Sequence, residues 1–346
     1  MNIKAIVLTG LVGSTLLLTG CGGGGGGGSS AATAIDGFNM TEGSADTKLG
    51  ATYMQEILTA ASSSTTVSTM YSRIDLTGLE SAHSAGWTGK GKTITVMDGN
   101  SFSGNGYHGR YVSDIARFVA PGASRNEYVL SDVLTDSSKN ITTIASDIIT
   151  TSSGYTPFSV AADGTLASNL DDLVHDMESS SALVTVAAQH SNWTGTGSGD
   201  KNYAGNGGFT DCPVSGTMTV SNCNTWSIDG LDSSNVIYVG EVDSSNNIPD
   251  WSNQAGSAHK NQFIVTSSDA ITSSSDGSPD GNSFAAPRVA GAGALVRHKF
   301  PNLSGAQTAT TILHTADDLG VAGVDAVYGH GKLNVGKALA PVGNLH

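Results

Sequence analysis

Basic residues are scarce in this chain. Its 346 residues include 16 Lys and Arg against 30 Asp and Glu, a formal net charge of −14 at pH 7. This charge repels phosphate backbones and anionic lipid headgroups, which argues against a nucleic-acid-binding protein and against polybasic contact with a membrane. Charged residues of both signs make up only 13% of the chain, whereas Gly, Ser and Thr are abundant. Such a composition favours a loop-rich α/β enzyme over a helical bundle.

Long hydrophobic runs are also missing. No window after the first twenty residues approaches the roughly 20 apolar residues that a membrane span needs, and no fixed-period repeat or coiled-coil heptad is present. Residues 1–20 carry Lys4 and then an apolar stretch that Gly10 and Gly13 interrupt. This pattern predicts an export signal and not a membrane-spanning helix.

The chain has only three cysteines. Cys21 follows Leu18-Thr19-Gly20, which resembles the lipobox of bacterial lipoproteins, so residues 1–20 are interpreted as a lipoprotein signal peptide and Cys21 as the lipidated first residue of the mature chain. The alternative is a cleaved secretory peptide with an accidental cysteine. By the same resemblance, Gly22 favours the outer membrane or cell surface of a Gram-negative host. For Cys212 and Cys223 we expect a local disulfide in an oxidising compartment, with two buried free thiols as the alternative.

The chain divides into four parts. After the signal peptide, residues 21–39 form a Gly/Ser-rich tether. Residues 40–73 form an N-terminal extension that is compatible with helix, either a structural lead-in or a short pro-segment. Residues 74–341 form the main domain, in which β-branched runs at 93–97, 145–149, 183–186 and 236–239 predict buried strands, and residues 166–177 and 285–298 predict helices. Alternation of strand and helix predicts a parallel sheet with helices on both faces.

Three residues carry the candidate chemistry. Asp98 stands at the exit of the strand at 93–97, where a carboxylate can orient an imidazole. His108 begins a helix that buries its other face, and an imidazole there can accept a hydroxyl proton at neutral pH. Ser283 lies after a glycine turn at the mouth of an apolar helix rich in small residues. A serine in that position is either an N-cap or a nucleophile beside free NH groups that stabilise an oxyanion.

In this order of Asp, His and Ser, the chain resembles the subtilisin-like serine peptidases, the subtilases (peptidase S8). The segment from Gly281 to Gly291, GNSFAAPRVAG, is similar to the family's Gly-Thr-Ser-x-Ala-x-Pro-x-Val-x-Gly. Residues 236–243, 251–253 and 328–339 agree further, and the last of these looks like the passenger domains of autotransporter subtilases. The resemblance implies a three-layer subtilisin-like fold, and a serine endopeptidase that acts on polypeptides through an Asp98-His108-Ser283 triad and an acyl-enzyme. Together with the interpretation of residues 1–21, it predicts an exported, membrane-anchored enzyme.

The resemblance also implies roles for residues around the triad. The family's oxyanion donor corresponds to His190 without a gap, or to Asn192 after a two-residue shift. The family's substrate-pairing strand corresponds to Ser152, Ser153 and Gly154, although an ordinary polar loop is the alternative there. The interval from Asp98 to His108 is shorter than in most family members. We expect no cofactor and no metal, because the missing residues remove calcium-binding or rim elements.

Two other functions compete with the peptidase. The first is a catalytically inactive subtilase fold that serves as a surface binding module, which the short interval before His108 and the altered signatures would explain. The second is an esterase with a Gly-x-Ser-x-Gly elbow, for which Asp317 and His330 follow the serine in the required order. Ala285 in place of the second glycine weakens the esterase interpretation.

Overall fold

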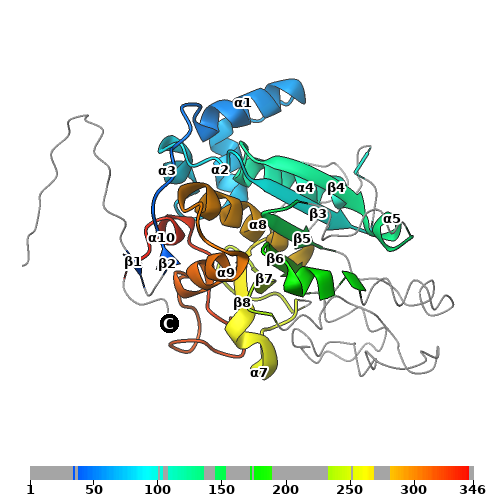
Figure 1. Cartoon of the computed structure of the whole chain (residues 1–346), viewed down its shortest axis with the longest axis vertical. Coiled ribbons are helices and arrows are strands. Elements are labelled where there is room, and N and C mark those ends of the chain that lie inside the picture. Colours follow the sequence, from blue (N-terminus) through cyan, green and yellow to red (C-terminus); the bar gives the residue numbers. More distant parts are fainter. Residues whose placement is uncertain are drawn as a thin grey trace, which may run out of the picture. The chain divides into compact units, whose positions relative to one another are not determined.

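In the computed structural model, a six-stranded sheet forms the centre of the main domain (Figure 1). It describes residues 34–35, 38–99, 102–103, 108–135, 145–152, 172–173, 175–188, 233–250, 252–268 and 281–342. Every pair of neighbouring strands in this sheet is parallel. In spatial order the strands are β4 (Ser124–Val129), β3 (Thr93–Asp98), β5 (Ile148–Thr151), β6 (Leu183–Ala187), β7 (Val236–Val242) and β8 (Phe263–Ser267).

The helices, and one short ribbon, surround this sheet. They are α1 (Gly50–Ala60), α2 (Val67–Ile74), α3 (Leu79–Ser84), α4 (His108–Val119), α5 (Leu130–Thr135), α7 (Gly256–His259), the 3₁₀ turn Lys260–Gln262, α8 (Asn282–Lys299), α9 (Gly305–His314) and α10 (Val335–Ala338), and the ribbon pairs β1 (Ala34–Ile35) with β2 (Phe38–Asn39). Among the described helices, none is long and apolar enough to cross a bilayer.

The two faces of the sheet bury two separate apolar cores. One face joins strand residues such as Ile94 and Ile237 to α4, α8 and α9, while the other joins Ile149 and Tyr238 to α5 and to helical residues near Met177. The strand side chains are shared between the two cores because successive residues of a strand point to opposite faces of the sheet. The predicted three-layer α/β fold with a parallel sheet is confirmed.

The predicted elements agree with the structure in most places. β3, β6 and β7 contain three of the predicted strands, and α8 contains the helix predicted at 285–298. The strand predicted at 145–149 instead spans Ile148–Thr151. Residues 172–173 and 175–179 are helical, and the rest of the helix predicted at 166–177 lies outside the described residues. β4 and β8 were not predicted.

Helix α8 lies at the centre of the first core, and its small residues allow this. A Cβ added to Gly291 would lie 2.5 Å from Val119 Cβ on α4, and one added to Gly293 would lie 2.4 Å from a methyl of Leu183 on β6. Both distances are shorter than real contacts, so the glycines permit the close approach of α8 to a helix and to the sheet.

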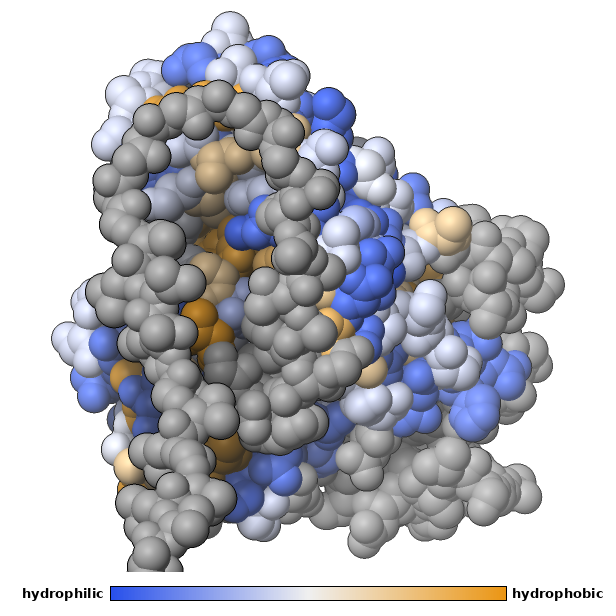
Figure 2. Space-filling view, turned by 60° about the vertical axis from the view of Figure 1, so that its left-hand side comes forward, coloured by the Kyte–Doolittle hydropathy of each residue, from blue (hydrophilic) through white to orange (hydrophobic). Residues whose placement is uncertain are grey.

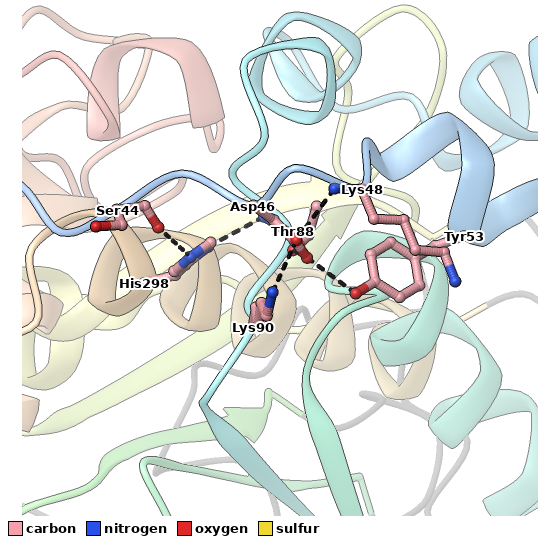
Figure 3. Close-up of polar contacts among 7 residues, drawn as sticks. All are labelled: Ser44, Asp46, Lys48, Tyr53, Thr88, Lys90 and His298. Atoms are coloured by element: carbon pink, nitrogen blue, oxygen red, sulfur yellow. Dashed lines mark hydrogen bonds and ion pairs between the residues drawn. The ribbon is translucent and has the colours of Figure 1, made fainter. Parts of the chain in front are cut away.

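The segment before α1 is held against the main domain by polar contacts around the buried carboxylate of Asp46 (Figure 3). The carboxylate of Asp46, 1% exposed, accepts hydrogen bonds from Lys90 at 3.0 Å, Tyr53 at 2.9 Å and the Lys48 NH at 3.1 Å. Burial raises the pKa of Asp46, but these donors outweigh it and lower the pKa to about 2. His298 of α8 accepts from the Thr88 NH and donates to a carbonyl of the same segment.

The described surface is mostly polar. On the face in Figure 2, hydrophilic residues dominate and apolar residues show as small separate patches. The large apolar side chains that are exposed in the described part of the chain are Leu49, Val321, Val324 and Val342.

Candidate active site

Asp98 and His108 meet at the carboxyl edge of the sheet. Asp98 is the last residue of β3 and is fully buried, while His108 is the first residue of α4 and its side chain is 29% exposed. His108 Nδ1 donates to Asp98 Oδ2 at 2.7 Å. This hydrogen bond places the proton of a neutral imidazole on Nδ1 and leaves Nε2 as a base. The ten-residue interval between the two residues is therefore long enough to close the pair.

Ser283 is the second residue of α8, and it does not cap the helix. Gly281 occupies the N-cap position with φ of 141°, a backbone conformation that favours glycine, and no side chain caps the helix there. The Phe284 NH returns to the Gly281 carbonyl at 2.8 Å, whereas Ser283 Oγ donates to the Ser152 carbonyl at 3.1 Å. The N-cap interpretation of Ser283 is therefore wrong, because its hydroxyl bonds to the Ser152 carbonyl and not to an NH of α8.

Ser152 directly follows β5 and hydrogen-bonds to the start of α8. Met97 pairs with Thr151, so the parallel register sets Asp98 level with Ser152 at the strand ends. Ser152 Oγ donates to the Ser283 carbonyl at 2.8 Å, reciprocating the bond from Ser283 Oγ. Ser152 is 4% exposed, and its predicted role in pairing with the substrate stays a prediction. Ser153 and Gly154, predicted beside it, lie outside the described residues.

The bond from Ser152 to the Ser283 carbonyl follows from a proline inside α8. In a regular helix this carbonyl would accept the NH of residue 287, but Pro287 has no NH to give. A carbonyl left without its helical partner in a buried place needs another donor. Ser152 Oγ supplies that donor and so fixes the first turn of α8 to the end of β5.

Aromatic and polar contacts hold the surroundings of Ser283. The ring of Phe284 lies 5.2 Å from the imidazole of His108, centroid to centroid, which places the start of α8 against the start of α4. On the other side, buried Asn282 accepts a 2.8 Å hydrogen bond from Ser252 Oγ. Asn253 Nδ2 donates to the Ala188 carbonyl at 2.6 Å, just beyond the end of β6.

The sequence marks residues 251–253 only as a stretch that resembles the family and predicts no role for Ser252 or Asn253. Their residue types gave no signal of these contacts, because both partners lie at least 30 positions away along the chain. Together the two residues tie the start of α8 to the exit of β6. In the sequence, the predicted oxyanion residues follow this strand.

Several predicted site residues lie outside the described residues. These are the alternative oxyanion donors His190 and Asn192, the lipidation residue Cys21, and the cysteines Cys212 and Cys223. Within the described part of the chain, no group of three or more His, Cys, Asp or Glu could hold a metal ion.

The residues of the esterase interpretation are engaged elsewhere. The Asp317 carboxylate accepts from Asn334 at 3.0 Å and pairs with Lys337 at 2.7 Å. His330 donates to the Asn261 carbonyl at 3.1 Å, and burial lowers its pKa. Neither side chain hydrogen-bonds the other or Ser283 among these described contacts, so the arrangement gives the esterase no support.

Comparison with known proteins identifies a family that this sequence matches. The model of the subtilase family (peptidase S8) matches residues 131–331. The Neisserial autotransporter lipoprotein NalP of Neisseria meningitidis is 48% identical over 59 residues, which is 17% of this chain and 6% of that protein. An extracellular serine protease of Serratia marcescens is 43% identical over 63 residues, 18% of this chain and 6% of that protein. Subtilisin DY of Bacillus licheniformis is 36% identical over 100 residues, 29% of this chain and 35% of that protein.

Solved structures agree with the fold. A lanthipeptide protease superposes with a TM-score of 0.55 at 16% identity, covering 79% of this chain and 94% of its own. The prenylagaramide maturation protease PagA superposes with a TM-score of 0.50 at 19% identity, covering 76% and 97%. At these identities the likeness shows the shared fold alone. The sequence matches to the first two relatives above span only a small part of those longer proteins.

Proposed function

Because this chain belongs to the subtilase family of serine peptidases, we propose that it is an exported serine endopeptidase with Asp98, His108 and Ser283 as its catalytic triad. The observation that carries the proposal is the 2.7 Å hydrogen bond from His108 Nδ1 to the buried carboxylate of Asp98. It orients an imidazole beside the helix that presents Ser283, since Phe284 touches the same ring. An inactive binding module would not require this pair to be kept.

The proposed reaction is acyl transfer to serine. Ser283 Oγ turns from the Ser152 carbonyl toward His108 Nε2, gives up its proton and attacks the peptide carbonyl. Asp98 stabilises the imidazolium that forms. The tetrahedral intermediate collapses as His108 protonates the leaving amine, so the C–N bond breaks and the acyl-enzyme remains. Water, deprotonated by His108, then releases the acid and restores Ser283.

Charge on the oxyanion requires donors near the start of α8. The Ser283 NH lies in the first turn of a helix, where NH groups have no intrahelical partner and the helix dipole favours negative charge. A second donor from Asn192 or His190 completes the proposed oxyanion hole. Loss of such a donor lowers turnover by on the order of 10² to 10³.

The substrate is proposed to be an extended polypeptide. Ser152, at the end of β5, offers a main-chain carbonyl that now holds Ser283 Oγ. A substrate NH that takes this carbonyl would free the hydroxyl for His108, so binding and activation would be coupled. Ser153 and Gly154 would extend the pairing of substrate backbone with the chain.

Export and anchoring belong to the same proposal. The relatives named above include an autotransporter lipoprotein and an extracellular protease, which supports an exported or surface location. Lipidation of Cys21 would hold the protein at the outer membrane, and Cys212 would pair with Cys223. Intact-mass measurement tests both: an added diacylglyceryl mass should vanish in Cys21→Ser, and reduction should add two hydrogens.

A fluorophosphonate probe tests the triad directly, because it reacts only with an activated serine. We expect the purified protein to be labelled on Ser283, and labelling to disappear in Ser283→Ala and His108→Ala. Ser304→Ala, which removes a serine that caps α9, is the control and should be labelled like the wild type. A folded wild-type protein that takes no label would instead favour the inactive binding module.

A further inference from the structure

One arginine on the nucleophile helix is fully buried. Arg288 lies on α8, five residues after Ser283, and has 0% exposure, which makes it the largest completely buried side chain of the described residues. Its guanidinium reaches back to the first turn of α8, where it contacts the Phe284 carbonyl. A buried guanidinium is costly unless its NH groups are hydrogen-bonded. Its contacts therefore indicate what it holds.

The guanidinium bonds to backbone carbonyls of two helices. Nε donates to the Ile74 carbonyl at 3.0 Å and Nη2 to the Arg73 carbonyl at 3.3 Å. Nη1 donates to the Phe284 carbonyl at 2.7 Å. Arg288 thus joins the last residues of α2 to the residue that follows Ser283, across more than 210 positions of sequence.

The two ends of this link differ in what the backbone there needs. Helix α2 ends at Ile74, and Asp75 follows in the left-handed conformation, so the last carbonyls of α2 have no helical NH to accept. A cation at a helix C-terminus is also favoured by the helix dipole. At the other end, Phe284 sits in the turn that Pro287 weakens, and its ring packs on His108.

From this geometry we infer that Arg288 is a positioning residue for the reaction. It fixes the first turn of α8 against α2. Through its bond to the Phe284 carbonyl, it holds Ser283 in position beside the imidazole of His108. Helix α2 is therefore a working part of the catalytic domain and not a removable pro-segment. This inference rests on the proposed triad.

The chain offers a matched control on the same helix. Arg297 also lies on α8 and also donates to backbone carbonyls, those of Asp147 at 2.7 Å and Ser181 at 3.3 Å. It lies nine residues further along, near the end of α8 that is remote from Ser283. Substituting either arginine removes a guanidinium from α8, but only Arg288 holds the turn of the nucleophile.

The experiment compares Arg288→Met, Arg288→Lys and Arg297→Met in the full chain. For each we would measure the melting temperature, the rate of fluorophosphonate labelling, and kcat and KM on an unstructured polypeptide such as casein. We expect Arg288→Met to lower kcat and the labelling rate on the order of ten- to a hundredfold, with KM within about twofold, because a misplacement of about 1 Å can lower a rate on the order of a hundredfold. Arg288→Lys should recover part of the loss, since one ammonium can still reach a carbonyl.

Arg297→Met should lower the melting temperature but leave kcat and labelling unchanged. If Arg288→Met loses stability to a similar degree and keeps wild-type kcat below its melting temperature, Arg288 serves packing alone and the inference is wrong. Should Arg288→Met fail to fold, an unchanged kcat in Arg288→Lys overturns it equally. Wild-type protein that is not labelled at all would refute the triad, which is a separate and distinguishable outcome.

Discussion

Acid should destabilise this protein through a buried histidine that plays no part in the reaction. His83 of α3 is fully buried. Its Nε2 donates to the Val119 carbonyl at 2.9 Å, and its Nδ1 accepts from Tyr71 OH at 3.0 Å. A Cβ added to Gly50 of α1 would lie 2.1 Å from the ring, so there is no room for a solvating water on that side. The neutral imidazole thus links α1, α2, α3 and α4.

The sign and size of the effect follow from its pKa. Burial lowers the pKa of His83 from 6.5 to about 4, against a smaller opposite effect of the hydrogen bond to Val119. Between these two pH values the unfolded chain binds a proton that the folded protein does not, so the stabilising contribution is complete above pH 6.5 and is lost as pH falls toward 4. At about 1.4 kcal/mol per pKa unit, the loss in the free energy of unfolding is about 3 kcal/mol.

Urea unfolding at pH 7 and pH 4 measures this loss. The Ser283→Ala background prevents self-digestion, and His83→Gln serves as reference because an amide keeps one donor and one acceptor without titrating. We expect the free energy of unfolding to fall by about 3 kcal/mol more in the protein with His83 than in His83→Gln. Equal losses in the two proteins would show that His83 is not held neutral by the fold, and the burial argument would then be wrong.

Three further changes have expected outcomes. Asp98→Asn should lower kcat by about 10⁴, because the imidazole loses its orienting carboxylate; steady-state kinetics with an unchanged melting temperature checks this, and a loss under tenfold would contradict it. Ser152→Ala leaves the Ser283 carbonyl without its donor and should cost about 1–3 kcal/mol of unfolding free energy in urea, whereas no change would mean that water replaces the hydroxyl. Gly291→Val should cost at least about 1–3 kcal/mol by calorimetry, because its Cβ would overlap Val119; an unshifted melting curve would show that α8 can move away from α4.

The residues proposed for the reaction could be predicted because each stands at the boundary of a regular element. A strand that ends at Asp98, and helices that start near His108 and Ser283, are visible as local patterns of apolar residues. The carboxyl ends of parallel strands share one edge of the sheet, which agrees with the triad that the family resemblance implies. Of the contacts expected within the triad, the described residues show the 2.7 Å hydrogen bond between Asp98 and His108.

Other parts of the fold gave no local signal. Strand β4 reads SRNEYV and lies at the edge of the sheet, so it lacks the apolar run of a buried strand. The apolar run of β8 is only three residues long, Phe263 to Val265, which does not distinguish a strand from a turn of helix. The docking of the N-terminal segment depends on Asp46 reaching Lys90, 44 positions away, and no periodicity encodes such a distance.

The stretch after Ser283 shows where prediction from sequence stops. From Pro287 alone one can deduce that the Ser283 carbonyl lacks its helical donor, since residue 287 has no NH. One can deduce equally that a buried carbonyl must find another donor. Which side chain supplies it cannot be deduced, because Ser152 is 131 positions away on another element. The same holds for Arg288, whose charge in an apolar helix signals a required partner while the carbonyls of Arg73 and Ile74 become visible only in three dimensions. The sequence thus states what the first turn of α8 needs, and the fold determines which residues provide it.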